Sequence, residues 1–304
     1  MTSEADTGVP SAKPVDGRLA LLTGWLRQPG VLCSLPALGL LLLGFAAPLF
    51  VVFGYSFMPP RTFDFTLLPT LDNYRHIFAE SYYQSFLWAL FLASVTVLLL
   101  QLICYPLAYG MAKLFGRWSN LLTLVLVIPL FVSENIRLYG WVLFLIKGGV
   151  VSGTLKAWFG LDLGGLIYNV PAIVLGLVYV YLPFTLFPLV LGVSMVPREL
   201  TEAAGDLGAN RWQVFREVEL PLAMPGILIG SLLTFVLSLG SLAESKILGG
   251  QAVIMIADDI ETAFTFGQNW PLGSALSVLL LTLTGGLVLA LLRRLDLDAI
   301  LGRR

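Results

Sequence analysis

The sequence predicts an all-α membrane protein that crosses the bilayer six times. Of its 304 residues, 57% are hydrophobic and only 12% are charged, against about 25% charged residues in ordinary soluble domains. The mean hydropathy is +0.86, and the apolar residues gather in long runs. A membrane-spanning helix needs about 20 mainly apolar residues. Spans are expected near residues 31–55, 85–111, 120–146, 171–195, 227–248 and 273–292.

The first apolar run is expected to be a retained span. Residues 31–55 are too long for the apolar core of a signal peptide, and no small-residue cleavage site follows a short core. Residues 1–30 before it are rich in polar residues, Pro and Gly, which predicts a tail that is disordered at least in part. Residues 294–304 are expected to form a second tail, so that the six-span domain occupies residues 31–293.

The distribution of Lys and Arg predicts that both termini lie in the cytoplasm. With the N-terminus inside, twelve basic residues fall in inner segments and four in outer loops, and short cytoplasmic loops normally carry the excess. The inner residues are Lys13, Arg18, Arg27, Lys113, Arg117, Arg198, Arg211, Arg216, Arg293, Arg294, Arg303 and Arg304. The outer residues are Arg61, Arg75, Lys147 and Lys156.

Several classes of site are excluded by composition. A formal net charge of −1 without a basic stripe argues against a nucleic-acid partner. Cys33 and Cys104 both lie in apolar runs and are expected to act as small core hydrophobes. The single histidine, His76, is expected in a solvated loop, so no metal site is predicted.

Charged residues inside the third span have two interpretations. Glu134 and Arg137 are three residues apart and so share one helical face. They either line a solute path or form a mutually neutralising pair that fixes helix packing. Pro129, about one turn earlier, is a candidate bend in this helix.

The end of the fifth predicted span carries Glu244 and Lys246, which are two residues apart. They should point to different faces of the helix and have different partners. Lys246 can also extend its ammonium group to the membrane interface.

The loop between the fourth and fifth spans, residues 196–226, is more polar and longer than a connector requires. Pro197 suits the first turn of a helix. Glu199 and Glu202 follow, where the positive end of the helix dipole favours acids. A short helix is therefore expected at the start of the loop.

Small residues come next in this loop. Ala203, Ala204 and Gly205 leave the backbone almost bare, which permits close approach by another protein. The loop is therefore interpreted as a projection that enters a groove of a partner. The alternative is an amphipathic element on the membrane surface, for which its acidity is poorly suited.

A second short helix is expected after the small residues. Asn210 is a suitable N-cap, and Gln213 stands three residues later, which is the spacing of a capping box. Pro221 and Pro225 are expected to end this helix before the fifth span.

The segment EAAGDLGANRWQVFREVELPLAMPGI, which begins at Glu202, resembles the EAA loop of ATP-binding-cassette importer permeases. In that family the loop forms coupling helices that dock on a cytoplasmic ATPase. By this resemblance the ATPase-coupling residues are Glu202, Ala203, Ala204, Gly205, Asp206, Leu207, Gly208, Ala209, Leu220 and Pro221.

The similarity extends over about residues 31–293. Further segments look like the subfamily that includes spermidine and putrescine permeases. They are LDNYRHIF at 71–78, YPLAYGMAK at 105–113, IRLYGW at 136–141, GLVYVYLPFTLFPL at 176–189, LGG at 248–250 and NWPLGSALS at 269–277.

The resemblance implies a MetI-like type I importer permease of the bacterial inner membrane. Its implied partners are two ATPase subunits, a second permease subunit, an extracytoplasmic solute-binding protein and membrane lipid. A different second permease is favoured over an identical copy. The chain has no GxxxxGK[ST] phosphate-binding loop, so ATP and Mg are expected in the partner ATPase. We expect no catalytic residue and no cofactor in this chain.

The solute class stays open at this level. Polyamine permeases that resemble this chain tend to carry an acid at the position of Lys246, which lies before LGG. A polyamine and an amino-acid-like or anionic solute are therefore both considered. The candidate residues of the translocation path are Glu134, Arg137, Glu244 and Lys246. Asp258, Asp259 and Glu261, in the last outer loop, either contact the binding protein or form a solvated face.

Two other function classes compete. An ion-coupled secondary transporter or channel would act without an ATPase, but such proteins show internal repeats with interrupted helices. No repeat is evident between residues 31–146 and 171–292. An intramembrane enzyme has little support, because the sequence has no HExxH and no GxSxG motif.

Overall fold

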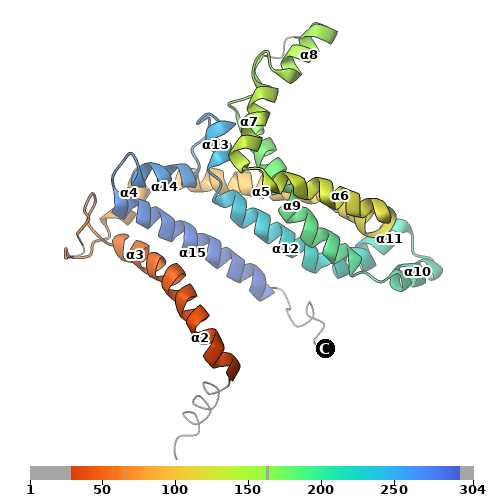
Figure 1. Ribbon diagram of the computed structural model, residues 1–304, viewed down its shortest axis with the longest axis horizontal. Coiled ribbons are helices and arrows are strands. Elements are labelled where there is room, and N and C mark those ends of the chain that lie inside the picture. Colours follow the sequence, from red (N-terminus) through yellow and green to blue (C-terminus); the bar gives the residue numbers. More distant parts are fainter. Residues whose placement is uncertain (1–28, 65, 162–163, 295–304) are drawn as a thin grey trace, which may run out of the picture. The chain divides into compact units, whose positions relative to one another are not determined.

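The computed structural model describes residues 29–64, 66–161 and 164–294, and these residues form helices joined by turns with no β-strand among them (Figure 1). The helices are α2 (Pro29–Leu41), α3 (Ala47–Tyr55), α4 (Asp72–Ala79), α5 (Tyr83–Tyr109), α6 (Arg117–Val127), α7 (Glu134–Leu145), α8 (Val150–Phe159), α9 (Val170–Ser194), α10 (Arg198–Asp206), α11 (Arg211–Val214), α12 (Leu220–Leu239), α13 (Ala243–Ile247), α14 (Ile256–Phe264) and α15 (Trp270–Arg294). Wider π turns occupy Leu42–Ala46, Gly110–Leu114 and Phe215–Glu219, and a 3₁₀ turn occupies Ile128–Phe131.

Six helical segments of the described residues are long and apolar enough to cross a membrane, as the sequence predicts. They are Ser34–Tyr55, Tyr83–Leu114, Glu134–Phe159, Val170–Ser194, Arg211–Leu239 and Trp270–Ala290. The predicted tails fall at residues 1–28 and 295–304, outside the described ranges. The side chain of Cys33 also lies outside them.

The chain divides into two units at Gly54 and Tyr55, and each is described by itself. In the first unit, α2 and α3 are joined through the π turn Leu42–Ala46 into one apolar helix. None of the side chains described between residues 34 and 54 is buried. Among the described residues of its own unit, this helix therefore has no apolar surface to pack against.

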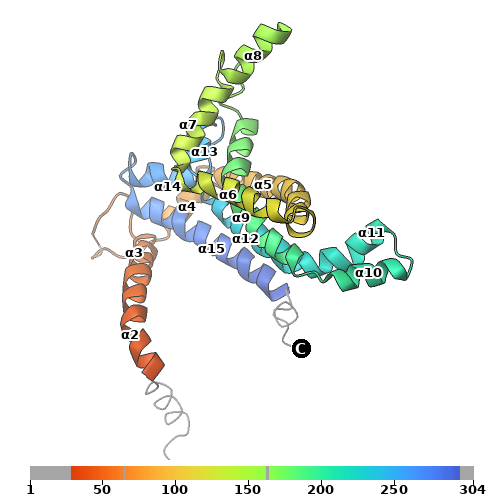
Figure 2. The ribbon, with the colours of Figure 1, turned by 45° about the vertical axis from the view of Figure 1, so that its right-hand side comes forward.

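The second unit is built around α5, α9 and α12, which pack closely together. Both ribbon views show these helices side by side (Figures 1 and 2). Leu92 and Leu100 of α5 and Leu186 and Leu189 of α9 are completely buried. Helices that are apolar on every side, as these are, pack in the interior of a protein or in a membrane.

Glycine lets α9 and α12 approach without side chains between them. A Cβ built on Gly192 would lie only 2.8 Å from the Cα of Gly226, closer than real side chains come. Small residues at such crossings are typical of membrane helices. Nearby, the buried hydroxyls of Thr185 and Thr234 share a hydrogen bond across the same interface.

The prediction of one continuous third span at residues 120–146 is wrong, because the helix is broken within this range. The chain forms α6, a 3₁₀ turn that contains Pro129, an extended residue at Val132, and then α7. Pro129 cannot donate a backbone hydrogen bond and disfavours a continuing α-helix. Ser133, with ψ near 139°, then begins a new helix whose first turn holds Glu134, where an acid is favourable.

The predicted fifth span, residues 227–248, is displaced toward the N-terminus. The helical segment runs from Arg211 to Leu239 and ends at Gly240. After this break the chain forms the separate five-residue helix α13. Glu244 and Lys246 therefore lie beyond the fifth span and not inside it.

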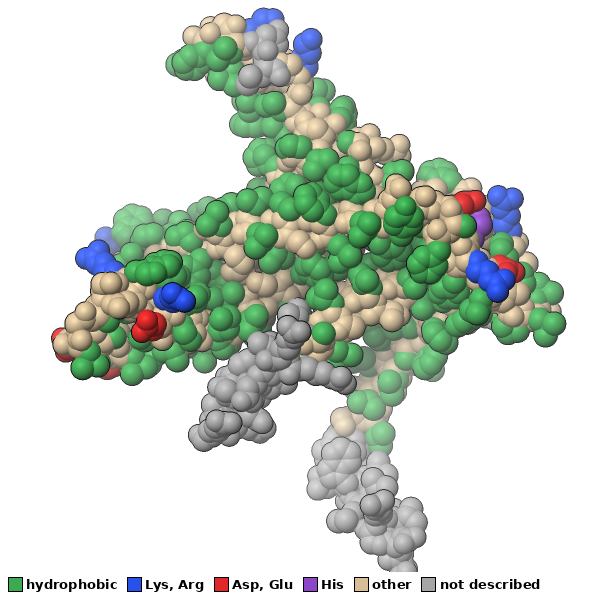
Figure 3. All heavy atoms as spheres, turned by 180° about the vertical axis from the view of Figure 1, so that it is seen from behind, with side chains coloured by type: hydrophobic (Ala, Val, Ile, Leu, Met, Phe, Trp, Pro, Cys, Tyr) green, Lys and Arg blue, Asp and Glu red, His purple; other side chains and the backbone are tan. Residues whose placement is uncertain are grey.

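The helices α4, α13 and α14 lie at one end of the second unit, and α10 and α11 at the other (Figures 1 and 2). His76 is on α4 and not in a loop, and its Nε2 lies 3.0 Å from Oε1 of Glu80. Cys104 is fully buried, as predicted. The face in Figure 3 shows charged groups at both of these ends and at the tip of the projecting segment at the top, with hydrophobic and uncharged surface along the helices between the two ends.

Candidate functional site

The loop that follows α9 forms two short helices at the end of the bundle. Pro197 is the N-cap of α10, with φ −65° and ψ 138°, so the helix starts one residue later than the sequence suggests. Glu199 lies in the first turn of α10 as expected. Gly208 has φ +88° and turns the chain toward α11, a conformation that glycine adopts without strain.

The capping box predicted at the start of α11 is confirmed. The side chain of Asn210 accepts a hydrogen bond from the backbone N–H of Gln213 at 2.9 Å. The Gln213 side chain in turn accepts from the backbone N–H of Asn210 at 2.8 Å. These two bonds fix the direction in which the chain re-enters the bundle.

The prediction that prolines end this second helix is wrong. The helix continues from α11 through the π turn Phe215–Glu219 and past Pro221 and Pro225 into α12. A π turn is wider and shifts the backbone hydrogen bonds by one residue. It therefore reduces the conflict that the ring and missing N–H of Pro221 would create in a regular α-helix.

The small-residue segment on α10 is open to the surroundings. Ala203 and Gly205 are exposed, and a Cβ placed on Gly205 would meet no atom within 4 Å. Leu207 is 89% exposed and Trp212 is 66% exposed. The Trp212 ring stacks on Phe215, with centroids 5.3 Å apart. The loop therefore presents an apolar surface with polar edges that nothing in the described residues covers.

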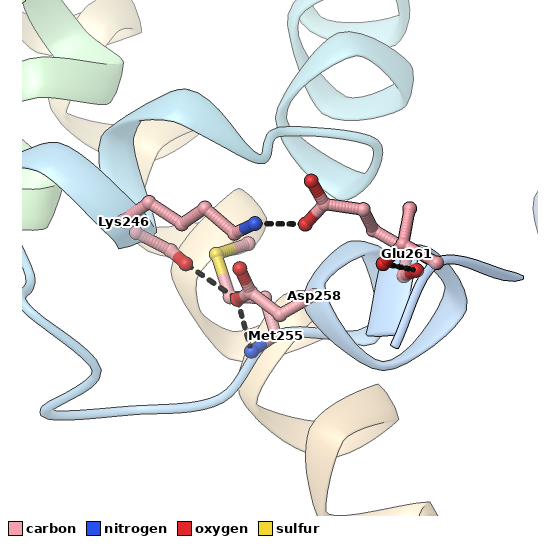
Figure 4. A network of polar contacts seen from close by, with 6 residues as sticks. Lys246, Met255, Asp258 and Glu261 are labelled. Carbon is pink, nitrogen blue, oxygen red and sulfur yellow. Dashed lines mark hydrogen bonds and ion pairs between the residues drawn. The ribbon is translucent and has the colours of Figure 1, made fainter. Parts of the chain in front are cut away.

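At the opposite end of α12, the short helix α13 is joined to α14 by a polar network (Figure 4). Lys246 forms an ion pair with Glu261. Ser245 donates a hydrogen bond to Oδ2 of Asp258, which also accepts from the backbone N–H of Met255 at 2.9 Å. Within the fold, Glu244 and Lys246 thus have different partners, as their spacing predicts.

The acids of α14, expected either to contact the binding protein or to form a solvated face, do not form a solvated face. Asp258 is buried, and Glu261 is held by Lys246. Burial raises the pKa of Asp259 above its ordinary range, an effect that a hydrogen bond from Ser85 opposes. The sequence does not reveal this burial, because it depends on how α14, which carries these residues, packs against the rest of the protein.

A cavity of about 530 Å³ lies between α7, α9 and the α12–α13 break. Its polar lining includes Glu134, Asn135, Tyr181, Ser241 and Lys246. Of these, only Glu134 and Lys246 were singled out from the sequence. Tyr181 and Ser241 come from apolar or small-residue segments, and no spacing signal connects them.

Glu244 lies next to this cavity but is completely buried. Burial raises the pKa of Glu244 to about 7, and Glu134 adds a smaller repulsion in the same direction. Ser241 donates a hydrogen bond to the carboxylate and opposes the rise. Glu244 is therefore a support of the cavity wall and not part of its accessible surface.

Arg137 does not form an ion pair with Glu134 among the described residues. Its guanidinium instead lies over the ring of Tyr179, 5.8 Å from the ring centroid. The hypothesis that Glu134 and Arg137 neutralise each other is thus wrong in this structure. Glu134 has no ion-pair partner in the described part of the chain, and it borders the cavity.

Six apolar helical segments, an exposed amphipathic loop at one end and a polar cavity near the other define a membrane transport subunit. Residues 104–296 match the family described as "Binding-protein-dependent transport system inner membrane component". The chain belongs to this family.

Individual relatives agree with the family match. The chain is 35% identical to a spermidine/putrescine transport system permease protein of Haemophilus influenzae, over 76% of this chain and 82% of that protein. It is 34% identical to the corresponding protein of Escherichia coli K12, over 83% and 92%. It is thus the permease subunit of an ATP-binding-cassette importer and a multi-pass inner-membrane protein.

A solved structure shares the fold. It is a bacterial ABC transporter involved in the import of the acidic polysaccharide alginate, with a TM-score of 0.64 and 20% identity over 92% of this chain and 97% of that chain. The family implies ATPase and solute-binding partners and a second permease. An ion-coupled transporter or channel acting alone is therefore the wrong class.

Proposed function

We propose that this permease imports an organic cation and that residues 199–221 are its contact with a separate ATPase. The cavity next to α13 supports the choice of cation. Lys246 forms an ion pair with Glu261. Glu134, in contrast, borders the cavity and has no ion-pair partner among the described residues. A carboxylate next to the Tyr181 ring suits an ammonium group.

The Lys246–Glu261 pair removes the reason to favour an anionic solute. The sequence alone suggests a positive charge in the path. Since the ammonium group of Lys246 is balanced by Glu261, it does not add net positive charge to the cavity. Relatives named as spermidine/putrescine permeases favour a polyamine-like cation.

The coupling assignment rests on the exposure of the loop. Leu207 and Trp212 are the most exposed large apolar side chains there, and Gly205 leaves room for a partner's backbone. Large apolar groups that rim a bare helix surface are typical of protein contacts. We propose that the ATPase receives α10 in a groove and that ATP and Mg are bound there.

The topology follows from this assignment. If the ATPase is cytoplasmic, α10 and α11 lie inside, and with an even number of spans both termini do as well. The excess of Lys and Arg in the inner segments supports this orientation. We further propose a heteromeric complex with a different second permease, two ATPase subunits and an extracytoplasmic solute-binding protein.

Uptake by the assembled importer tests the solute class. Proteoliposomes that contain the full complex are supplied with its binding protein and with labelled spermidine, putrescine, arginine or a dicarboxylate. We expect ATP-dependent uptake of the polyamines, and a several-fold loss in Glu134→Gln but not in Asp72→Asn, which alters an exposed carboxylate on α4. Uptake of the dicarboxylate alone would overturn the proposal.

A further inference from the structure

Helix α5 and the π turn Gly110–Leu114 that continues it contact both ends of the loop at residues 196–226, which we call the coupling loop. At the first end, the Lys113 ammonium group donates a hydrogen bond to the backbone carbonyl of Val196, between α9 and α10. The Arg198 guanidinium at the start of α10 donates to the backbone carbonyl of Lys113 at 3.3 Å. The two basic side chains thus cross between the ends of α5 and α9.

This crossed arrangement places a basic side chain beside each of two helix ends. The last carbonyls of a helix lack intrahelical partners, and cations are favourable at this negative end of the dipole. Lys113 supplies a cation two residues after the end of α9, and Arg198 supplies one in the π turn that follows α5. The segment after α9 is thus held by Lys113, and the segment after α5 is held by Arg198 at the start of α10.

At its second end, the loop meets the same helix again. The Tyr109 hydroxyl donates a hydrogen bond to Oε1 of Glu219 at 3.3 Å. The rings of Tyr105 and Phe215 meet edge to face, with centroids 5.4 Å apart. Both Phe215 and Glu219 belong to the π turn that leads from the loop into α12.

The contacts continue one turn further into the membrane. Gln101 donates hydrogen bonds to Oγ of Ser231 at 2.7 Å and to the carbonyl of Ile227 at 3.2 Å. Four residues spaced by four along the chain therefore make these contacts from α5 and from the π turn Gly110–Leu114 that continues it. They are Gln101, Tyr105, Tyr109 and Lys113, which we call the α5 stripe.

We propose that the α5 stripe is a positioning element that makes α5 move together with the coupling loop when the ATPase displaces it. The inference rests on the proposed function of the loop. The peptide chain already ties the loop to α9 and α12. The peptide chain does not connect the loop directly to α5. The α5 stripe therefore adds α5 to the group of helices that move with the loop.

The arrangement of the stripe supports a mechanical role. Packing of α5 in the bundle is already supplied by buried apolar residues such as Leu92 and Leu100. The polar stripe lies at the loop end, where Lys113 and Tyr109 hold the two opposite ends of one loop. A tie at only one end would allow the loop to tilt relative to α5, and two ties prevent it.

Cross-linking provides a direct test. In a background with Cys33→Ser and Cys104→Ala, Tyr109→Cys and Glu219→Cys are joined by a short thiol-specific bifunctional reagent in the complete importer. If α5 and the loop move as one body, the cross-linked complex retains ATP-dependent uptake. The single-cysteine variants treated with the same reagent are the control. Loss of uptake only in the cross-linked pair would overturn the inference.

A second test loosens the tie. Tyr109→Phe combined with Lys113→Met removes one hydrogen bond at each end of the loop. We expect the amount of solute imported per ATP hydrolysed to fall roughly five- to tenfold, the scale expected for losing two hydrogen bonds. Lys113→Arg in place of Lys113→Met should restore most of the ratio, because it returns a cation to the end of α9.

The outcomes separate this inference from the proposed function. If the ATPase fails to copurify with the unmodified chain, the coupling assignment itself is wrong. If the ATPase copurifies with the double variant and the imported amount per ATP is unchanged, only the role of the α5 stripe is wrong. A fall in the ratio with normal ATPase binding supports both.

Discussion

Lys246 of α13 and Glu261 of α14 form an ion pair that joins two short helices at one end of the bundle. The residues are fifteen positions apart in sequence, and each side chain keeps about a third of its surface exposed. A partly exposed pair contributes modestly to stability. Its larger effect is on charge, because it balances the basic group that borders the cavity.

The first prediction concerns this pair. Lys246→Met and Glu261→Gln should each lower the thermal unfolding temperature of the detergent-solubilised protein by a few degrees. The double variant should lose less than the sum, with a coupling free energy of about 0.5–1 kcal/mol for such a pair. A double-mutant cycle measured by thermal unfolding checks this. Strict additivity would show that the two side chains do not interact.

The second prediction concerns Asp258, whose carboxylate caps the start of α14. Asp258→Asn should destabilise the protein by about 1–2 kcal/mol, because it weakens bonds from the Met255 N–H and from Ser245. Asp72→Asn, on an exposed part of α4, is the matched control. Equal unfolding midpoints for the two variants in denaturant would contradict the assigned role.

The third prediction concerns Gly205. Gly205→Glu should abolish copurification of the ATPase through bulk and charge, while the six spans stay inserted. Gly205→Ala is the control, because the added methyl group meets no atom within 4 Å and favours the helix. Normal ATP-driven uptake by Gly205→Glu would show that α10 is not the contact.

The fourth prediction is a pH dependence from Glu244, which lies beyond the end of α12. Its pKa is raised to about 7, mainly by burial, so between its ordinary value and pH 7 the folded state holds a proton that the unfolded state releases. Stability should therefore fall as pH rises through this window. Glu244→Gln should flatten the dependence in thermal unfolding scans from pH 5 to 8. An unchanged slope would rule out Glu244 as its source.

The sequence predicts the fold well because membrane spans are signalled by local composition. The number of apolar segments is six, as predicted, although the third lies at Glu134–Phe159 and not at residues 120–146. Asn210 and Gln213 form the capping box that their spacing indicates. Errors arise where a local signal is overridden. Pro129 lies in the turn that separates α6 from α7 and so divides the span predicted at residues 120–146, whereas Pro221 is accommodated by a π turn that no residue pattern reveals.

The polar site is less accessible to sequence reasoning, since it is assembled from different helices. Glu261 is fifteen residues from Lys246, and nothing in the spacing of the two connects α13 to α14. Tyr181 lies on α9, far along the chain from Glu134 on α7, and only the packed bundle brings both to one cavity. Charge near a span end can be read from the sequence, but its partner cannot.

The close approach of Gly192 and Gly226 has a consequence for how force travels. The backbones of α9 and α12 touch just before the two chains diverge into the loop, so no compressible side chain separates them. If α10 is the contact with the ATPase, as proposed above, a force on α10 cannot be absorbed by pressing these two helices together, and it should displace α9 and α12 jointly. A methyl group added at Gly226 should force the two backbones apart, because it would clash with the carbonyl oxygen of Pro188.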